Sequence, residues 1–220
     1  KFVGHPLLDS VKPSLSKDDF LKKHGFDPEN PVLGLLPGSR HQEIIRHLPE
    51  MLKVINKLQT ENENIQVIIG KAQHIPGDTY NKIFTLSGHS AILSEDIYDI
   101  MHYSSVVVVS SGTATLETAI AGTPMVIVYK MAALTYIIAK RMVSLPYIGM
   151  ANIVHGSKIV PELVQEDVNE QNICREVGRL LSDKKAYVET RKILNSTRSL
   201  LGDTGASKRA VELLVEVLGD

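Results

Sequence analysis

Two short apolar blocks separated by a helix-favouring segment constrain this chain more than any other feature. The blocks, residues 106–109 and 125–128, are mostly β-branched, and each has the length of one buried strand. The residues between them include Ala, Leu and Glu, which favour a helix, and Gly122 and Pro124 end it. This stretch predicts a strand, a helix and a second strand, joined as a right-handed crossover of a parallel sheet.

The turn before the predicted helix has the features of an anion site. Ser111, Gly112 and Thr113 lie where the helix begins, and the free backbone N–H groups of a helix start bind anions such as phosphate. Glu117 comes about one turn later, where a carboxylate could accept hydrogen bonds from a ribose diol. An ordinary strand–helix unit with a Ser/Thr cap and a solvent-exposed Glu117 explains the same residues equally well.

The remaining chain alternates between strand and helix patterns. Strands are predicted at residues 31–36, 65–69, 91–93, 106–109 and 125–128. Further helices are predicted at residues 16–24, 42–59, 78–86, 97–102, 131–142, 169–181, 184–200 and 206–218. We therefore expect an α/β fold, with a doubly wound, mainly parallel, Rossmann-like sheet and helices on both faces. Residues 1–168 should form this domain, and residues 169–220 should form helices that pack on it.

A second loop is expected to meet the anion turn. Ligands of such sheets bind beyond the carboxyl ends of the strands, so the loop after residues 31–36 should face the same cleft as Ser111. In that loop Gly38 allows a close approach of the backbone, and Ser39 and Arg40 follow it. The planar guanidinium of Arg40 suits phosphate, and the alternative is a surface Arg beside a helix start. Together the loops indicate a diphosphate ligand, in a chain that has neither a P-loop nor a Gly-x-Gly-x-x-Gly fingerprint.

Composition narrows the possible functions. The 220 residues are 43% hydrophobic and 22% charged, which suits a globular domain with a core. The net charge of −1 argues against broad binding to nucleic acid. The single Cys174 excludes an internal disulfide and a Cys-based zinc site, and the eight histidines lack metal-ligand spacing, so no metal and no cofactor are expected. The longest apolar region, residues 119–139, contains Gly122, Pro124 and Lys130, which indicates a strand and a helix instead of a membrane span.

Several ordered motifs carry a family resemblance. They are residues 2–7 (FVGHPL), 35–43 (LLPGSRHQE), 111–117 (SGTATLE), 129–131 (YKM), Asn152 and 161–166 (PELVQE). The set resembles the carboxyl-terminal half of lipid-A-disaccharide synthase, an inverting glycosyltransferase of the GT-B class with two Rossmann-like domains. That family transfers 2,3-diacylglucosamine from UDP to 2,3-diacylglucosamine 1-phosphate in the lipid A biosynthesis of bacterial lipopolysaccharide. The resemblance implies that this chain supplies the UDP-sugar site of such a hexosyltransferase.

The resemblance also implies roles for the matched residues. The residues implied to bind the UDP-sugar are Gly38, Ser39, Arg40, Ser111, Gly112, Thr113, Glu117, Asn152, Gln165 and Glu166. The two loops should hold the diphosphate, Glu117 the ribose, and the last three residues match positions near the donor site. Arg40 should act in catalysis, because it can stabilise the charge that develops on the leaving UDP. Residues 144–152 depart from the family's tighter Leu-Pro-Asn pattern, so Asn152 is either a ligand contact or a loop cap.

The proteins of this family also have an amino-terminal half that has no counterpart in this chain, and that half indicates what this chain should interact with. In the family that half shapes the acceptor site and supplies the proposed base, so this chain alone should bind the donor without turning it over. The last predicted helix should cross to that half or pair with a second copy in a homodimer. The helix at residues 131–142 is apolar with Lys140 and Arg141 at its end, so it either packs in the core or touches an anionic membrane. The expected location is the cytoplasm, including the inner face of the inner membrane.

Two other functions fit the same residues. A UDP-N-acetylglucosamine 2-epimerase has a similar scaffold and nucleotide site, but it needs acid and base groups in the cleft. A non-catalytic nucleotide-sugar binding module belongs to a different class, and it gains weight if the native gene begins near Lys1. Because the sequence does not begin with Met, further sequence is expected upstream.

Overall fold

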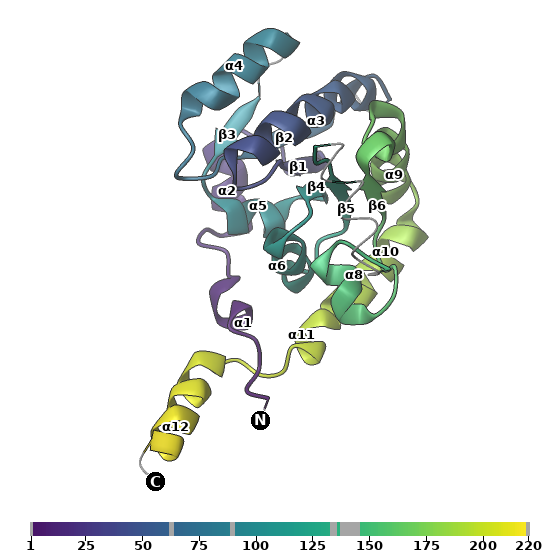
Figure 1. The fold of residues 1–220 in the computed structure, drawn as a ribbon. Helices are drawn as coiled ribbons and strands as arrows, with labels where there is room; N and C mark the ends of the chain where they lie inside the picture. Colours follow the sequence, from purple (N-terminus) through teal and green to yellow (C-terminus); the bar gives the residue numbers. More distant parts are fainter. Residues whose placement is uncertain (1, 62–63, 89–90, 133–135, 137–145, 219–220) are drawn as a thin grey trace.

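A six-stranded parallel sheet forms the centre of the molecule. The computed structural model describes residues 2–61, 64–88, 91–132, 136 and 146–218 (Figure 1). The strands are β1 (Val32–Leu36), β2 (Gln66–Gly70), β3 (Ile92–Ser94), β4 (Val106–Ser110), β5 (Met125–Tyr129) and β6 (Glu162–Val164). Their order across the sheet is β3-β2-β1-β4-β5-β6, and each neighbouring pair is parallel. The predicted doubly wound, Rossmann-like arrangement is confirmed.

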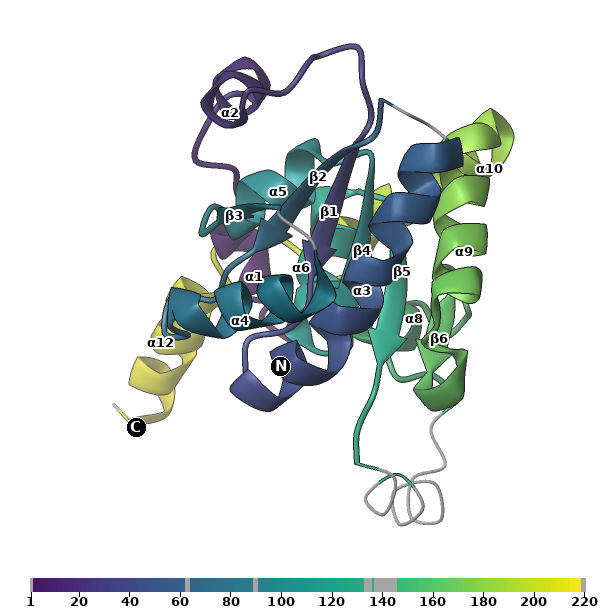
Figure 2. The ribbon, with the colours of Figure 1, turned by 90° about the horizontal axis from the view of Figure 1, so that it is seen from above.

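Helices cover both faces of this sheet (Figures 1 and 2). They are α1 (Leu7–Ser10), α2 (Lys17–His24), α3 (His41–Glu61), α4 (Gly77–Ser87), α5 (Ile97–Tyr103), α6 (Thr113–Ala121), α8 (Met150–His155), α9 (Glu170–Ser182), α10 (Lys184–Asn195), α11 (Thr197–Leu200) and α12 (Ala206–Leu218), with a short 3-10 turn, η1, at Gln165–Asp167. On one face α3, α4 and α9 pack against alternate strand residues such as Val106 and Val108. On the other face α2, α5, α6 and α10 pack against Val107 and Val109. Because both faces are covered, all four valines are buried, which explains an unbroken apolar run in one strand.

Most of the predicted strands and helices match the structure, and one difference is the short helix α1, which was not predicted. β6 was missed, because it has only three residues and begins with a Glu. The helix predicted at residues 184–200 divides at Ser196 into α10 and α11, and α8 lies in a stretch predicted to be a loop. The helix predicted at residues 131–142 falls largely outside the described residues. Ser16 caps α2, since its hydroxyl accepts a hydrogen bond from the Asp19 N–H.

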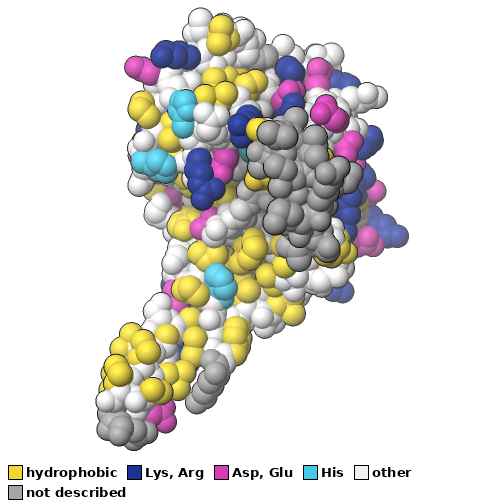
Figure 3. Space-filling model, viewed as in Figure 1, with side chains coloured by type: hydrophobic (Ala, Val, Ile, Leu, Met, Phe, Trp, Pro, Cys, Tyr) yellow, Lys and Arg dark blue, Asp and Glu magenta, His cyan; other side chains and the backbone are white. Residues whose placement is uncertain are grey.

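The N-terminal segment lies beside the start of α12, and α12 projects from the body with the C-terminus at its far end (Figure 1). The guanidinium of Arg209 donates hydrogen bonds to the carbonyl of Val3, and the Gly205 N–H donates to the carboxylate of Asp9. Beyond this junction α12 carries apolar side chains that remain exposed: Val211, Leu214, Val215, Val217 and Leu218. Figure 3 shows apolar atoms gathered over this projecting end.

Candidate functional site

The order of the strands places a cleft at the centre of the sheet edge. The chain winds outward from β1 through β2 to β3 and then returns to form β4 on the other side of β1. Such a reversal opens a crevice between the loops that follow the two central strands. A cleft of about 310 Å³ lies there, between the loop after β1, the start of α6, and the apolar side chains of Leu36, Ile97 and Met101.

The cleft brings together the two predicted loops. Its lining includes seven of the residues implied by the sequence: Gly38, Ser39, Arg40, Ser111, Gly112, Thr113 and Glu117. Asn152, Gln165 and Glu166 do not line it. The candidate site therefore consists of two facing loops from opposite sides of the switch point.

Free backbone donors lie at the start of α6. Gly112 takes the position before the helix with φ +146° and ψ −162°, a conformation that favours glycine. Within the described part of the chain, the backbone N–H groups of Gly112, Thr113 and Ala114 have no acceptor. Such N–H groups, at the positive end of a helix dipole, suit the oxygens of a phosphate.

Ser111 differs from its neighbours in this turn. Its N–H donates to the carbonyl of Val128 over 3.0 Å. Its hydroxyl donates to the carbonyl of Ile148 over 2.7 Å. Both of its polar hydrogens are therefore used within the chain, so Ser111 lines the cleft without a free donor.

The loop after β1 is closed by a residue that the sequence analysis missed. One carboxylate oxygen of Glu43 accepts the N–H groups of Ser39 at 2.9 Å and Arg40 at 3.2 Å, and the other accepts from the Arg40 guanidinium at 3.0 Å. A Cβ at Gly38, where φ is +129°, would meet Glu43 at 2.5 Å, so only glycine fits there. The side chain of Arg40 remains 82% exposed. The signal for Glu43 was a Glu in the first turn of a predicted helix, where it can reach back to the loop.

Glu117 lies on α6 at the border of the cleft. It also lines a neighbouring hollow with Ser14, Asp96 and Tyr98. Its carboxylate accepts a hydrogen bond from the hydroxyl of Tyr98 at 3.2 Å. Burial raises the pKa of Glu117, and the hydrogen bond from Tyr98 opposes that shift. A partly buried carboxylate beside the cleft can accept hydrogen bonds from a sugar diol.

A buried histidine, also missed, joins two loops of the site. His47 on α3 is fully buried, with Nδ1 2.9 Å from the carbonyl of Pro37 and Nε2 2.9 Å from the N–H of Lys130. Because a carbonyl can only accept and an N–H can only donate, the proton belongs on Nδ1 and the ring is neutral. Burial lowers the pKa of His47, with the two backbone hydrogen bonds opposing that shift. His47 thus ties the loop after β1 to the end of β5.

The three remaining predicted residues lie beside β5 and β6. Asn152 is buried, and within the described residues its amide bonds to Ile159, Val160 and Glu162, as a loop cap would. Gln165 has φ +53°, and its amide pairs with both backbone groups of Met131, at 2.8 and 3.3 Å. Glu166 is exposed in η1.

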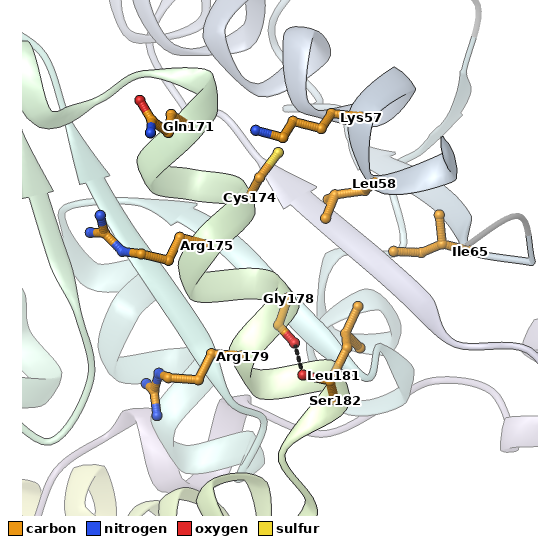
Figure 4. Close-up of a pocket in the computed structure, with 10 residues that line it drawn as sticks. All are labelled: Lys57, Leu58, Ile65, Gln171, Cys174, Arg175, Gly178, Arg179, Leu181 and Ser182. Carbon is orange, nitrogen blue, oxygen red and sulfur yellow. Dashed lines mark hydrogen bonds between the residues drawn. The ribbon is translucent and has the colours of Figure 1, made fainter. Parts of the chain in front are cut away.

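A larger hollow of about 590 Å³ lies between α3 and α9 (Figure 4). It includes Ile65, directly before β2 begins, so it lies at the opposite edge of the sheet from the cleft. In Figure 4 Lys57 and Cys174 point toward each other, while Arg175 and Arg179 extend to the other side of α9. Both arginines pair with Glu176. This hollow therefore lacks the converging donors of the cleft.

Within the described residues, no cluster of three or more His, Cys, Asp or Glu side chains could hold a metal ion. In the same part of the chain, no helix combines the length and the apolar character needed to cross a membrane.

The Rossmann-like sheet with a cleft at its switch point has the fold that forms the nucleotide-binding half of GT-B enzymes. The family model described as lipid-A-disaccharide synthetase matches residues 1–217, and this chain belongs to that family. The lipid-A-disaccharide synthase of Geobacter sulfurreducens is 38% identical over 219 residues, which cover 99% of this chain and 57% of that protein. The chain thus spans little more than half the length of this curated relative.

Solved structures show the same fold. The chain matches the structure titled as a Staphylococcus aureus MnaA–UDP complex with a TM-score of 0.66 and 16% identity, over 99% of this chain and 54% of that one. It matches the calicheamicin glycosyltransferase CalG4 with a TM-score of 0.56 and 16% identity, over 88% of this chain and 44% of that one. At such low identity these likenesses concern the fold alone.

Proposed function

We propose that this chain supplies the UDP-donor site of a hexosyltransferase that moves 2,3-diacylglucosamine from UDP to 2,3-diacylglucosamine 1-phosphate. The observation that carries the proposal is the pairing of free N–H donors at the start of α6 with the guanidinium of Arg40 in one cleft. Membership of the lipid-A-disaccharide synthetase family supports the reaction and its substrates.

The diphosphate is the part of UDP that this cleft suits best. The N–H groups of Gly112, Thr113 and Ala114 are fixed by the helix and could receive one phosphate. Arg40 could turn from Glu43 to the second phosphate, with Gly38 and Ser39 keeping the loop close to it. As the glycosidic bond to UDP breaks, negative charge grows on the diphosphate, and donors already directed at it lower the barrier.

The remaining parts of the donor would extend along the carboxyl edge of the sheet. Glu117, partly buried at the border of the cleft, would accept hydrogen bonds from the ribose. Gln165 and Glu166, directly after β6, would lie toward the sugar, and Asn152 would support that side from its buried position. No step of this assignment requires a metal ion.

The acceptor and the base would come from a region outside this chain. We assign residues 1–168 to the donor domain and residues 169–220 to helices packed on it. The exposed apolar face of α12 would then pack on the upstream region, or on a second copy of this chain. The acyl chains of both substrates would favour a reaction at a membrane surface. We assign the reaction to the cytoplasm at the inner face of the inner membrane, with residues 131–142 as the candidate contact.

Turnover assays test the proposal. The chain alone should bind UDP without forming disaccharide, because positioning the acceptor contributes about 7–11 kcal/mol to barrier reduction and general-base help a further factor of about 10²–10⁴. Adding the upstream region of a family member as a separate polypeptide should restore disaccharide formation. If the protein were a 2-epimerase, NMR of the products would show an epimerised UDP-sugar and no disaccharide. Disaccharide formation by the chain alone would contradict the domain assignment, and failure to bind UDP would contradict the function.

A further inference from the structure

Behind the anion turn lies a hydrogen-bonded network that reaches β6. The hydroxyl of Ser111 donates to the carbonyl of Ile148, and its N–H donates to the carbonyl of Val128. These two bonds hold Ser111 in place, and the free N–H groups of Gly112 and Thr113 come directly after it in the chain. The direction of those donors therefore depends on where the Ile148 carbonyl is held.

Glu162 of β6 holds the Ile148 segment. One carboxylate oxygen accepts the N–H of Ile148 at 3.0 Å, and the other accepts the N–H of Gly149 at 2.9 Å. The second oxygen also accepts from the side-chain amide of Asn152 at 2.8 Å. No Lys, Arg or His forms an ion pair with Glu162 in the described part of the chain. The carboxylate is thus committed to three N–H donors.

The surroundings leave this network little freedom. Asn152 is fully buried, and its amide oxygen accepts the N–H groups of Ile159 and Val160. A Cβ at Gly149 would meet Cδ1 of Ile127 at 2.3 Å and Oε1 of Glu162 at 3.1 Å. The backbone of Gly149 therefore lies directly against β5 and β6. The segment has little room to shift toward another acceptor if the Glu162 carboxylate is lost.

We propose that Glu162 is a positioning residue for diphosphate binding, which acts through Ile148 and Ser111 on the donors at the start of α6. The inference rests on the proposed function, since UDP is the ligand whose binding reports it. It gives Ser111 the role of a tether and Asn152 the role of a support for Glu162, instead of direct contacts with the nucleotide.

Replacing the carboxylate tests this chain of contacts. In Glu162→Gln one oxygen becomes an NH₂ group, which would face an N–H donor, so the Ile148 segment loses an acceptor on one side. We expect UDP affinity to fall about five- to tenfold, as for the loss of one hydrogen bond. Exposed Glu189→Gln on α10 is the matched control and should leave affinity unchanged.

A double-mutant cycle separates positioning from general destabilisation. Calorimetry with UDP would compare the wild type with Ser111→Ala, Glu162→Gln and the double variant. If Glu162 acts through Ser111, the second substitution costs almost nothing once the first is present. Additive losses would overturn the inference, and so would a Glu162→Gln protein of normal affinity.

Two further measurements keep the outcomes distinct. Amide hydrogen exchange of Ser111, whose N–H donates to the carbonyl of Val128, should accelerate in Glu162→Gln, and unchanged exchange would contradict the positioning role without any ligand. If Glu162→Gln fails to fold, Glu162→Asp, which shortens the reach by one carbon, enters the same cycle. Absence of UDP binding in the wild type would contradict the proposed function, whereas additive losses with normal wild-type binding would contradict only the role of Glu162.

Discussion

The two loops of the cleft hold their hydrogen-bond donors in opposite ways. In the loop after β1, the backbone N–H groups of Ser39 and Arg40 are paired with Glu43, and the exposed side chain of Arg40, which pairs with the same carboxylate, can turn to a ligand. At the start of α6, the side chain of Ser111 is paired within the chain, and backbone N–H groups remain. One side of the cleft therefore offers a movable side-chain charge, and the other offers fixed backbone dipoles.

This difference separates two contributions to binding and catalysis. Fixed dipoles need no rearrangement when charge develops, so they act fully in the transition state. Arg40 must exchange Glu43 for the ligand, and part of its interaction energy replaces an existing ion pair. The start of α6 should therefore dominate affinity, and Arg40 should discriminate between nucleotides with one and two phosphates.

The largest expected effect follows from Gly112→Ala. Its Cβ would meet no atom within 4 Å, but φ +146° and ψ −162° are strained by about 1–3 kcal/mol for other residues. Relief of the strain turns the N–H groups away, so UDP affinity should fall at least about 100-fold, the loss of two hydrogen bonds to a charged group. Gly25→Ala, at φ +67° in open space at the end of α2, is the control for strain alone. Equal UDP affinity in the two variants, measured by calorimetry, would refute the role of the turn.

Arg40→Ala should have the next largest effect. UDP binding should weaken by about 1.5–3 kcal/mol, the range for hydrogen bonds to charged groups, while UMP binding should weaken less. The loop should keep its shape, because Glu43 still accepts the two backbone N–H groups. Calorimetry with both nucleotides measures the difference, and Arg175→Ala on α9 serves as an exposed control. Equal losses of affinity for UMP and UDP would contradict the assignment of Arg40 to the second phosphate.

The smallest effect concerns the histidine that connects the β1 loop to β5. Because burial lowers the pKa of His47, the unfolded chain binds more protons near the ordinary value of about 6.5. The contribution of His47 to stability is therefore complete above that pH and declines as the pH falls, by at most about 1.4 kcal/mol per pH unit. The pKa values of His24, His102 and His155 are also lowered by burial, so the wild type must be compared with His47→Gln.

Urea unfolding between pH 8 and pH 5 measures this difference. The free energy of unfolding should decrease more steeply with acidification in the wild type than in His47→Gln. Parallel curves would show that the pKa of His47 is the same in the folded and the unfolded chain, which would contradict this prediction.

The sequence predicted the central fold because its strands are buried on both faces. Val106 to Val109 could be predicted as a buried strand from these four residues alone, since a short apolar run of β-branched residues in an α/β chain indicates a strand. β6 escaped because only Leu163 of its three residues is buried. The start of α6 was recognisable from local sequence, since Gly112 and the helix after it are neighbours.

The residues that support the site were not predictable in the same way. Ser111 bonds to Ile148, 37 positions away, and His47 bonds to Lys130, 83 positions away. No periodic pattern encodes such pairs, because they arise only when the sheet brings separate loops together. Glu43 was the exception, since its contacts are local and its position in the helix indicates them.

The strand order also determines when the cleft can exist during folding. β1 pairs with β4 through Leu33 opposite Val106 and Leu36 opposite Val109, contacts between distant parts of the chain. Non-local parallel pairing is slow, because the entropy of closing a long loop is lost before the contacts form. A chain that has assembled only β1 to β3 has one loop of the cleft and no facing partner. The cleft therefore forms only together with the β1–β4 pairing, and a ligand that binds the complete cleft would stabilise that pairing.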